Sequence, residues 1–154
     1  MTRIGWGAGA VIVPQDLKAL IVDDNAYARS AMSGTLARLG LERVDETAGA
    51  AAAIGAMLGT RYDIVFMDWY MPEMNGAALL EILRGPNFPA PSRAPMVLVT
   101  AYPNRETFAR ARELGVAEIL VKPFTLAQVA GLLGRLIPGG WDLDDQPGGR
   151  RVLL

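Results

Sequence analysis

The 154-residue sequence predicts an α/β fold: a doubly wound, five-stranded parallel sheet with helices on both faces. Short apolar runs with the length of strands alternate along the chain with stretches in which apolar residues recur at helical spacing. Four of the five short runs are nearly continuous in apolar residues, which is typical of strands that helices cover on both faces. A single domain of this size buries roughly 68–70% of its unfolded surface and needs no disulfide or metal to hold it together.

Five segments are predicted to form the strands. Four are mainly apolar and each is followed directly by a polar residue: 17–22, 62–67, 96–99 and 118–121. The fifth segment, 43–47, is weaker and more polar, as expected of a strand at the edge of the sheet.

Five segments between and after these strands are predicted to be helices. In segment 28–39, apolar and small residues recur at helical spacing and stop before Gly40, a residue type that favours helix ends. Segment 126–136 has the same spacing before Pro138. The other helices are expected at 50–58, 75–84 and 105–114, and there is no repeat of fixed period.

The two ends of the chain differ from this alternation. Residues 1–15 are rich in Gly and Ala, and residues 138–154 are rich in Pro and Gly with separate acidic and basic clusters. We therefore expect an N-terminal extension over 1–15, a folded domain over 16–137 and a flexible C-terminal tail over 138–154. A docking peptide built on Trp141 or residues 152–154 is the alternative for the tail. The Pro-rich segment 85–95 is expected to be a surface loop.

The composition excludes several kinds of chemistry. The chain has no Cys and no His, so thiolate nucleophiles, His-based triads and Cys- or His-ligated metals are ruled out. The net charge of −1 offers no basic surface for nucleic acid or an anionic membrane. The early apolar run at 4–13 is far shorter than the ~20 residues of a membrane-spanning helix. We expect a cytoplasmic location and neither a nucleic acid nor a membrane as a partner.

Polar side chains with complementary chemistry follow four of the predicted strands: Asp23 and Asp24, Asp68, Thr100 and Lys122. The carboxyl ends of parallel strands share one edge of a sheet, so these side chains are expected to converge. Three carboxylates within ~5 Å of one another repel by roughly 3 kcal/mol per pair at an effective dielectric near 20, so cations must accompany them. Mg²⁺ (or Mn²⁺) suits such a site, and a carboxylate beside it can take up a phosphoryl group.

Four motifs around these residues resemble the response-regulator receiver domain of two-component signalling. They are LIVDDN at 20–25, MDWYMPEMNG at 67–76, VTA at 99–101 and VKPF at 121–124. Their order and spacing also agree, with steps of 44, 32 and 22 positions from Asp24 to Asp68, from Asp68 to Thr100 and from Thr100 to Lys122. The resemblance covers about residues 17–137 and is to the stand-alone, chemotaxis-type regulators. It implies a flavodoxin-like sheet with strand order 2-1-3-4-5.

The resemblance also implies a role for each acidic residue. Asp68 would accept a phosphoryl group from a phosphohistidine on a sensor histidine kinase or a histidine phosphotransfer protein. Asp24, Asp68 and the backbone carbonyl of Tyr70 would hold Mg²⁺, while Asp23 would help to position it indirectly. The chain would not be an enzyme beyond its own phosphorylation and dephosphorylation at Asp68.

The remaining motif residues have supporting roles in the family. Thr100 and Lys122 would contact the phosphoryl oxygens. Pro72 and Gly76 would shape the loop and the start of the helix after the phosphoacceptor. The bond between Lys122 and Pro123 is expected to be cis.

Four residues flank the site: Ile119, Tyr102, Ala101 and Pro123. The sequence departs from the family pattern at the first of them. Ile119 stands where the family commonly has an aromatic ring that turns inward on activation. Tyr102 could replace that ring, but we favour an exposed loop position for it. Tyr70 and Tyr102 could together crowd the path of an attacking water and prolong the life of the acyl phosphate.

The signal is expected to pass by protein contact. Only 17 residues follow Ile137, too few for an output domain, so the chain is expected to act as an effector, a phosphoryl shuttle or a phosphate sink. In the family the face made by the fourth helix, fifth strand and fifth helix, here about residues 105–136, usually carries the signal, and it is also where a homodimer would form. The kinase and the target cannot be named from the sequence.

Three alternatives belong to other functional classes. A haloacid-dehalogenase-type phosphatase needs a second acid two residues after its nucleophile, where this chain has Tyr70. A flavodoxin-like flavin binder needs a hydroxyl- and glycine-rich phosphate loop, where residues 23–25 would repel phosphate. A receiver fold that serves only for docking, without phosphorylation, is disfavoured because all five site residues are present.

Overall fold

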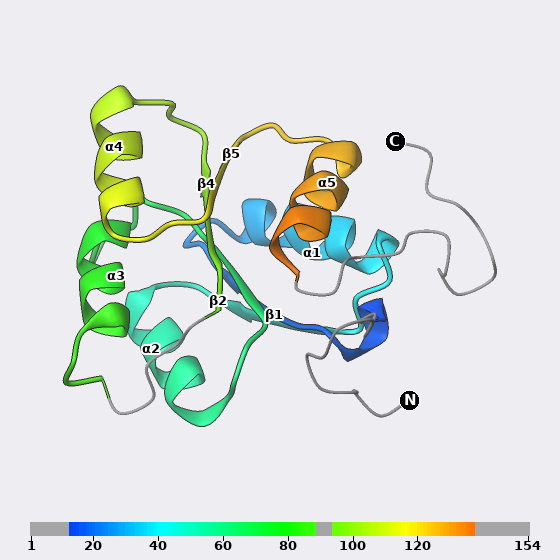
Figure 1. The fold of residues 1–154 in the computed structure, drawn as a ribbon, viewed down its shortest axis with the longest axis horizontal. Helices are drawn as coiled ribbons and strands as arrows, with labels where there is room; N and C mark the ends of the chain where they lie inside the picture. The colour runs from blue at the N-terminus through cyan, green and yellow to red at the C-terminus, as the bar shows by residue number, and fades with distance from the viewer. Residues whose placement is uncertain (1–12, 89–93, 138–154) are drawn as a thin grey trace.

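The computed structural model describes residues 13–88 and 94–137 of the chain, in which strands and helices alternate (Figure 1). A short 3₁₀ helix, η1 (Pro14–Asp16), comes first. The strands are β1 (Lys18–Val22), β2 (Arg43–Thr47), β3 (Ile64–Met67), β4 (Met96–Thr100) and β5 (Glu118–Val121). The helices are α1 (Ala26–Arg38), α2 (Ala50–Gly59), α3 (Gly76–Arg84), α4 (Arg105–Glu113) and α5 (Leu126–Leu136).

The five strands form one parallel sheet in the order β2-β1-β3-β4-β5, which confirms the predicted fold. The polar strand β2 lies at an edge, as its sequence predicts. In the register of the sheet, Val22 pairs with Thr47 of β2 and with Met67 of β3. The chain therefore leaves β1 and β3 at neighbouring points of the same edge.

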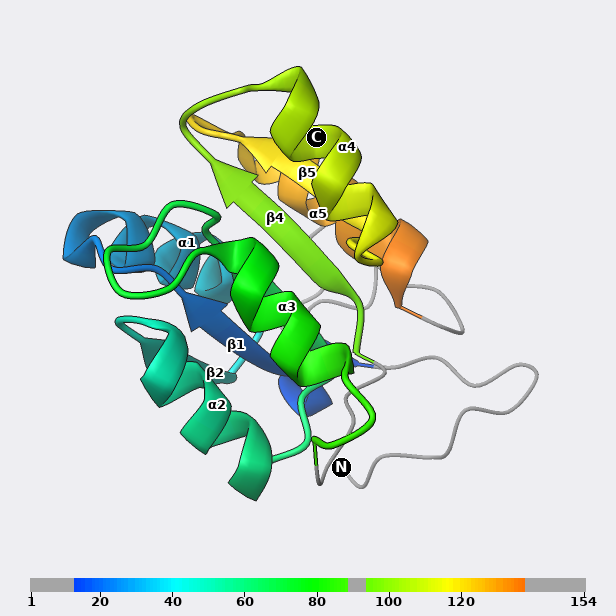
Figure 2. The ribbon, with the colours of Figure 1, turned by 90° about the vertical axis from the view of Figure 1, so that its left-hand side faces the viewer.

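Helices cover both faces of the sheet. Helices α2, α3 and α4 lie on one face and α1 and α5 on the other, as Figure 1 shows with the sheet between them and Figure 2 shows from the side of α3 and α4. The strands divide their side chains between two cores, because successive residues of a strand point to opposite faces. Leu20 and Val22 belong to the core under α2, α3 and α4, whereas Ala19 and Ile21 belong to the core under α1 and α5.

The helix ends follow local signals in the sequence. Four helices begin at a residue whose side chain accepts a hydrogen bond from a backbone N–H of the first turn: Asn25, Asn75, Asn104 and Thr125. Gly40 and Gly115 follow α1 and α4 with φ of 97° and 90°, a conformation that favours glycine. Helix α1 begins at Ala26, two residues before the predicted start, because Asn25 caps it. Within the described ranges, no helix is long and apolar enough to cross a bilayer.

Several predicted segments lie wholly or partly outside the described residues. These are 1–12 of the N-terminal extension, 89–93 of the Pro-rich segment and the whole of 138–154. Near the first of them, Pro14 of η1 is buried, two residues before the expected start of the domain at 16.

Gly76 and Gly34 provide a matched test of packing beside the site. A methyl group at Gly76 would lie 2.9 Å from Cε3 and 3.1 Å from Cα of Trp69, whereas one at Gly34 of α1 would have no atom within 4 Å. We expect Gly76→Ala to lower the free energy of unfolding by about 1–3 kcal/mol through overpacking. Gly34→Ala should raise it by up to about 1 kcal/mol, because alanine is the better helix former. Urea unfolding measures both, and a shift of the same sign in the two variants would contradict the packing at Trp69.

Candidate functional site

Three carboxylates meet at the carboxyl edge of the sheet. Asp23 and Asp24 follow β1, and Asp68 follows β3, the neighbouring strand. Each of the three offers an oxygen within 4.8 Å of the others. Backbone hydrogen bonds hold the strand ends beyond the sheet proper: the N–H of Asp23 donates to the carbonyl of Thr47 (3.1 Å), and that of Asp68 to the carbonyl of Val22 (2.9 Å). The predicted convergence of the acidic residues is therefore present in the fold.

Lys122 approaches the same carboxylates from the end of β5. Its ammonium lies 2.8 Å from Oδ2 of Asp23 and 3.7 Å from Oδ2 of Asp68. The Asp23 and Asp68 side chains are only 6% and 13% exposed, so these pairs are shielded from water. The bond between Lys122 and Pro123 is cis, as the family resemblance predicts. A single cation thus bridges two of the three acidic residues.

The hydroxyl of Thr100 lies at the end of β4. Thr100 is fully buried, and its Oγ1 accepts a hydrogen bond from the N–H of Tyr102 (3.1 Å). A hydroxyl that accepts one bond still has its own proton to donate. The carbonyl of Thr100 in turn accepts the N–H of Lys122 (2.8 Å), which ties the hydroxyl-bearing residue to the lysine.

Burial and charge act on the pKa of Asp68 in opposite directions. Burial, the largest influence, raises the pKa above 3.8; Lys122 lowers it, and the nearby charge of Asp23 raises it again. The net effect is a raised pKa, so the ionised form of Asp68 is less favourable in the folded protein than in water.

The residues present fit a divalent cation. Three carboxylates face the one ammonium of Lys122, which leaves two negative charges in this cluster. Carboxylate oxygens are the ligands that Mg²⁺ prefers, and Mg²⁺ keeps several waters, so it needs only an open site with one or two carboxylates. The exposed carboxylate of Asp24 leaves such an opening.

Two tyrosines stand at the rim of the site. Tyr70 follows Asp68 by two residues and directs its N–H toward Oδ1 of Asp68 at 3.4 Å. Its ring meets that of Tyr102 edge to face, with centroids 5.7 Å apart. The Tyr70 hydroxyl forms a hydrogen bond of 2.9 Å with Oγ1 of Thr107 in α4. Tyr102 is 68% exposed, as expected of a ring on a loop, yet it is held in place beside Tyr70.

The other flanking residues differ in their burial. Ile119 in β5 is partly buried and packs against the core under α2, α3 and α4. Ala101, Pro123 and Pro72 are exposed. Gly76 packs against Trp69, and its N–H donates to the Trp69 carbonyl (2.7 Å), which secures the loop after Asp68.

Sequence reasoning missed two residues with contacts at the site. Arg29 of α1 donates from Nη1 to the backbone carbonyl of Asp23 (2.7 Å), and Thr107 anchors Tyr70. Neither belongs to a motif. The partner of Arg29 is a carbonyl, which every residue has, so no sequence pattern could have indicated the contact.

Comparisons with known proteins agree with this geometry. Residues 19–133 match the family model described as the response regulator receiver domain. The chain is 31% identical over 125 residues to chemotaxis protein CheY-3 of Vibrio cholerae, covering 81% of this chain and 95% of that protein. It is 29% identical over 117 residues to a probable chemotaxis protein CheY of Rhizobium etli, covering 76% and 89%.

Solved structures give the same result. Chemotaxis protein CheY4 of Vibrio cholerae superposes with a TM-score of 0.70 at 26% identity, covering 79% of this chain and 98% of that one. The receiver domain of a sensor histidine kinase from Pseudomonas aeruginosa, solved with a magnesium ion coordinated in its active-site cleft, gives a TM-score of 0.69 at 26% identity, covering 78% and 96%.

The fold and the acidic pocket define a phosphoacceptor module of two-component signalling. The chain belongs to the response-regulator receiver domain family, and its homologues include single-domain regulators of the CheY type. It is thus a phosphorylated signalling protein rather than an enzyme that turns over a separate substrate, with an acidic pocket typical of Mg²⁺-dependent phosphorylation. Membership of this family argues against the two alternatives from other families, the phosphatase and the flavin binder.

The raised pKa of Asp68 predicts an effect on stability. In metal-free protein at pH 7, Asp68→Asn should increase the free energy of unfolding by on the order of 1 kcal/mol, because it removes a charge that burial disfavours. The advantage should fade as the pH falls toward the ordinary pKa of 3.8, because Asp68 with its raised pKa takes up a proton in the folded protein before it does in the unfolded chain. Urea unfolding at the two pH values measures the difference in stability between the variant and the wild type. Asp16→Asn is the control, because Asp16 precedes β1 and so lies at the end of that strand away from the site. A less stable Asp68→Asn variant at pH 7 would contradict the prediction.

Proposed function

We propose that Asp68 is the phosphoacceptor and that the donor is a phosphohistidine on a sensor histidine kinase or a histidine phosphotransfer protein. The observation that carries the proposal is the meeting of Asp23, Asp24, Asp68 and Lys122 at one edge of the sheet. A carboxylate oxygen of Asp68 attacks the phosphorus atom, and the phosphorus–nitrogen bond to the donor imidazole breaks. The imidazole leaves with the electrons of that bond, and an acyl phosphate remains on Asp68.

Lys122 and Thr100 are proposed to stabilise the transferring group. The Lys122 ammonium lies beside the carboxylate that would be esterified, so it can follow the negative charge from that carboxylate to the phosphoryl oxygens. The buried hydroxyl of Thr100 provides a hydrogen-bond donor from the neighbouring strand β4. The Lys122 ammonium is already beside Asp68 before the donor arrives, and such preorganised charge lowers the barrier to the reaction.

Mg²⁺ (or Mn²⁺) is the proposed cofactor. The carboxylates of Asp24 and Asp68 and the backbone carbonyl of Tyr70 would hold it, and Asp23 would act indirectly. The cation supplies charge neutralisation to the phosphoryl oxygens when bound. The open acidic cluster and the magnesium ion in the Pseudomonas aeruginosa receiver domain support this assignment.

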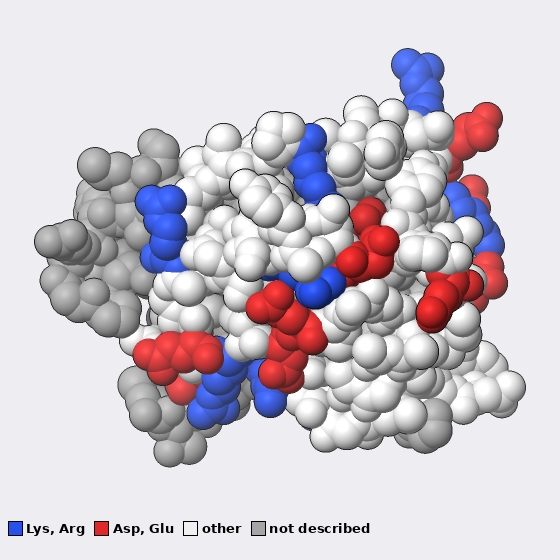
Figure 3. Space-filling model, turned by 180° about the vertical axis from the view of Figure 1, so that it is seen from behind, with Lys and Arg blue, Asp and Glu red and all other residues white. Residues whose placement is uncertain are grey.

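We further propose how the domain signals. Residues 16–137 form the proposed receiver domain. The phosphorylated form contacts a downstream protein through the face of α4, β5 and α5, which is also where a homodimer would form. Neither nucleic acid nor membrane is proposed as a partner, because the net charge is −1 and acidic and basic side chains are interspersed on the face seen in Figure 3. A cytoplasmic location stays a prediction of the sequence.

Phosphorylation by a small donor tests the proposal. The full chain incubated with acetyl phosphate and Mg²⁺ should gain the mass of one phosphoryl group, and chelation of the metal should abolish the gain. Asp68→Ala should gain nothing, and Lys122→Ala should react about 10²–10³-fold more slowly. Asp16→Asn is the matched control and should react at the wild-type rate. Labelling of Asp68→Ala would overturn the assignment, and an unlabelled wild type would favour the docking module without phosphorylation.

The positions of Tyr70 and Tyr102 lead us to expect a long-lived acyl phosphate on Asp68. Their rings meet at the rim of the site, and Thr107 anchors one of them, so together they can restrict the approach of water to the phosphorus atom. We expect Tyr70→Asn and Tyr102→Ala to hydrolyse about three- to tenfold faster, a change in barrier of about 1 kcal/mol. Tyr70→Phe keeps the ring and loses only the bond to Thr107, so it should lie between. Loss of the phosphoryl mass over time measures the rate, and unchanged or slower hydrolysis in both Asn and Ala variants would end the idea.

A further inference from the structure

Arg29 connects three elements beside the acidic cluster. It lies in the first turn of α1, and its side chain is only 19% exposed. Nη1 donates to the backbone carbonyl of Asp23 at 2.7 Å, and Nε lies 3.7 Å from Oε1 of Glu46 in β2. The guanidinium therefore joins the end of β1 to the neighbouring strand and to the helix that follows.

The Asp23 carbonyl belongs to the peptide group that joins Asp23 to Asp24, so its orientation affects both residues. The other polar groups of Asp23 are already held: its N–H by Thr47, Oδ1 by the N–H of Asn25 (2.9 Å) and Oδ2 by Lys122. A peptide group is planar, so a bond that fixes its carbonyl also fixes the direction in which the chain leaves for the next residue. The bond from Arg29 thereby restrains the backbone from which the exposed Asp24 side chain extends.

We propose that Arg29 is a positioning residue for the divalent cation: by holding the peptide between Asp23 and Asp24, it keeps both carboxylates directed at Asp68. The inference rests on the proposed metal site and adds to it a residue that does not touch the metal. Residues that orient metal ligands typically contribute 10–100-fold to affinity, so a loss at the lower end is expected without Arg29.

The charge of Arg29 has the opposite effect from its hydrogen bond. A guanidinium near the site repels a divalent cation, so an influence through charge alone would make the metal bind more tightly once Arg29 is removed. Glu46 lies 3.7 Å from the guanidinium and offsets part of its charge. The sign of the change in affinity therefore separates the two roles.

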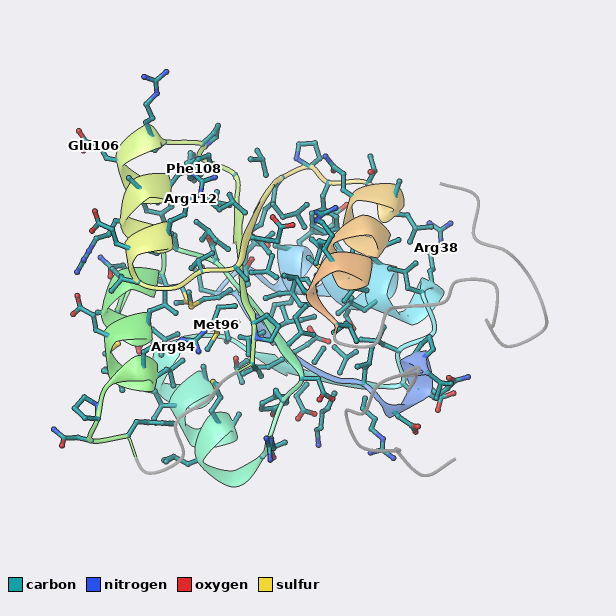
Figure 4. All side chains as sticks on the ribbon, in the orientation of Figure 1. Arg38, Arg84, Met96, Glu106, Phe108 and Arg112 are labelled. Atoms are coloured by element: carbon teal, nitrogen blue, oxygen red, sulfur yellow. The ribbon has the colours of Figure 1, made fainter. Side chains whose placement is uncertain are left out.

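Binding of Mn²⁺ to the full chain, followed by electron paramagnetic resonance of the free ion, tests the proposal. Arg29→Ala should raise the Kd about tenfold. Arg29→Lys keeps the charge and can still donate to the carbonyl, so it should recover most of the affinity. Arg38→Ala is the matched control, because Arg38 is an exposed arginine at the other end of the same helix (Figure 4), and it should leave the Kd unchanged.

Two further measurements separate positioning from folding and from charge. Urea unfolding identifies any variant that does not fold, and if Arg29→Ala fails to fold, Glu46→Gln replaces it: loosening the guanidinium should raise the Kd by a smaller factor. The loss in Arg29→Ala should persist at 0.5 M salt, where a charge effect shrinks. An equal or lower Kd in Arg29→Ala, or no recovery in Arg29→Lys, overturns the role of Arg29 alone. A wild type that binds no Mn²⁺ overturns the proposed metal site as well.

Discussion

The ion pair between Lys122 and Asp23 is the contact on which the site depends, because it neutralises part of an otherwise repulsive group of carboxylates. It joins residues 99 positions apart, at 2.8 Å and largely out of water. Without a cation at this point, Asp23 and Asp68 would face each other as two shielded negative charges, and each would destabilise the other. Lys122 also lies 3.7 Å from Asp68, so the charge that stabilises the resting site is already beside the atom proposed to react.

The sheet makes this contact possible. Strands β1, β3, β4 and β5 are adjacent and parallel, so their carboxyl ends bring Asp23, Asp68, Thr100 and Lys122 to one edge. The two apolar cores below hold the strands in register, and four of the five helices that begin beyond this edge have side-chain caps. The apolar cores therefore hold the strand ends in place, and the site itself requires only the appropriate polar residue at the end of each strand. The residues that stabilise the fold are thus largely different from the residues that form the site.

The rim of the site differs from the family pattern in the position of its aromatic rings. Where the pattern has an aromatic residue before the lysine, β5 has Ile119, which packs into the core. Aromatic rings stand instead on the loops after β3 and β4, where Tyr70 and Tyr102 contact each other and Tyr70 reaches Thr107 of α4. The contact between the site and α4 therefore runs through exposed loop residues and a hydrogen bond rather than through a buried ring.

The sequence by itself determined the alternation of strands and helices, most of their ends and the identities of Asp23, Asp24, Asp68, Thr100 and Lys122. These features follow from local patterns: apolar runs, helical spacing, caps and a polar residue directly after a strand. Only the tertiary structure decided that Asp23 is the buried member of the acidic pair, that Lys122 lies closer to it than to Asp68, and that Arg29 holds its carbonyl. Local sequence patterns do not predict contacts between distant residues. Contacts to backbone atoms are the hardest to predict, because every residue has the same backbone atoms.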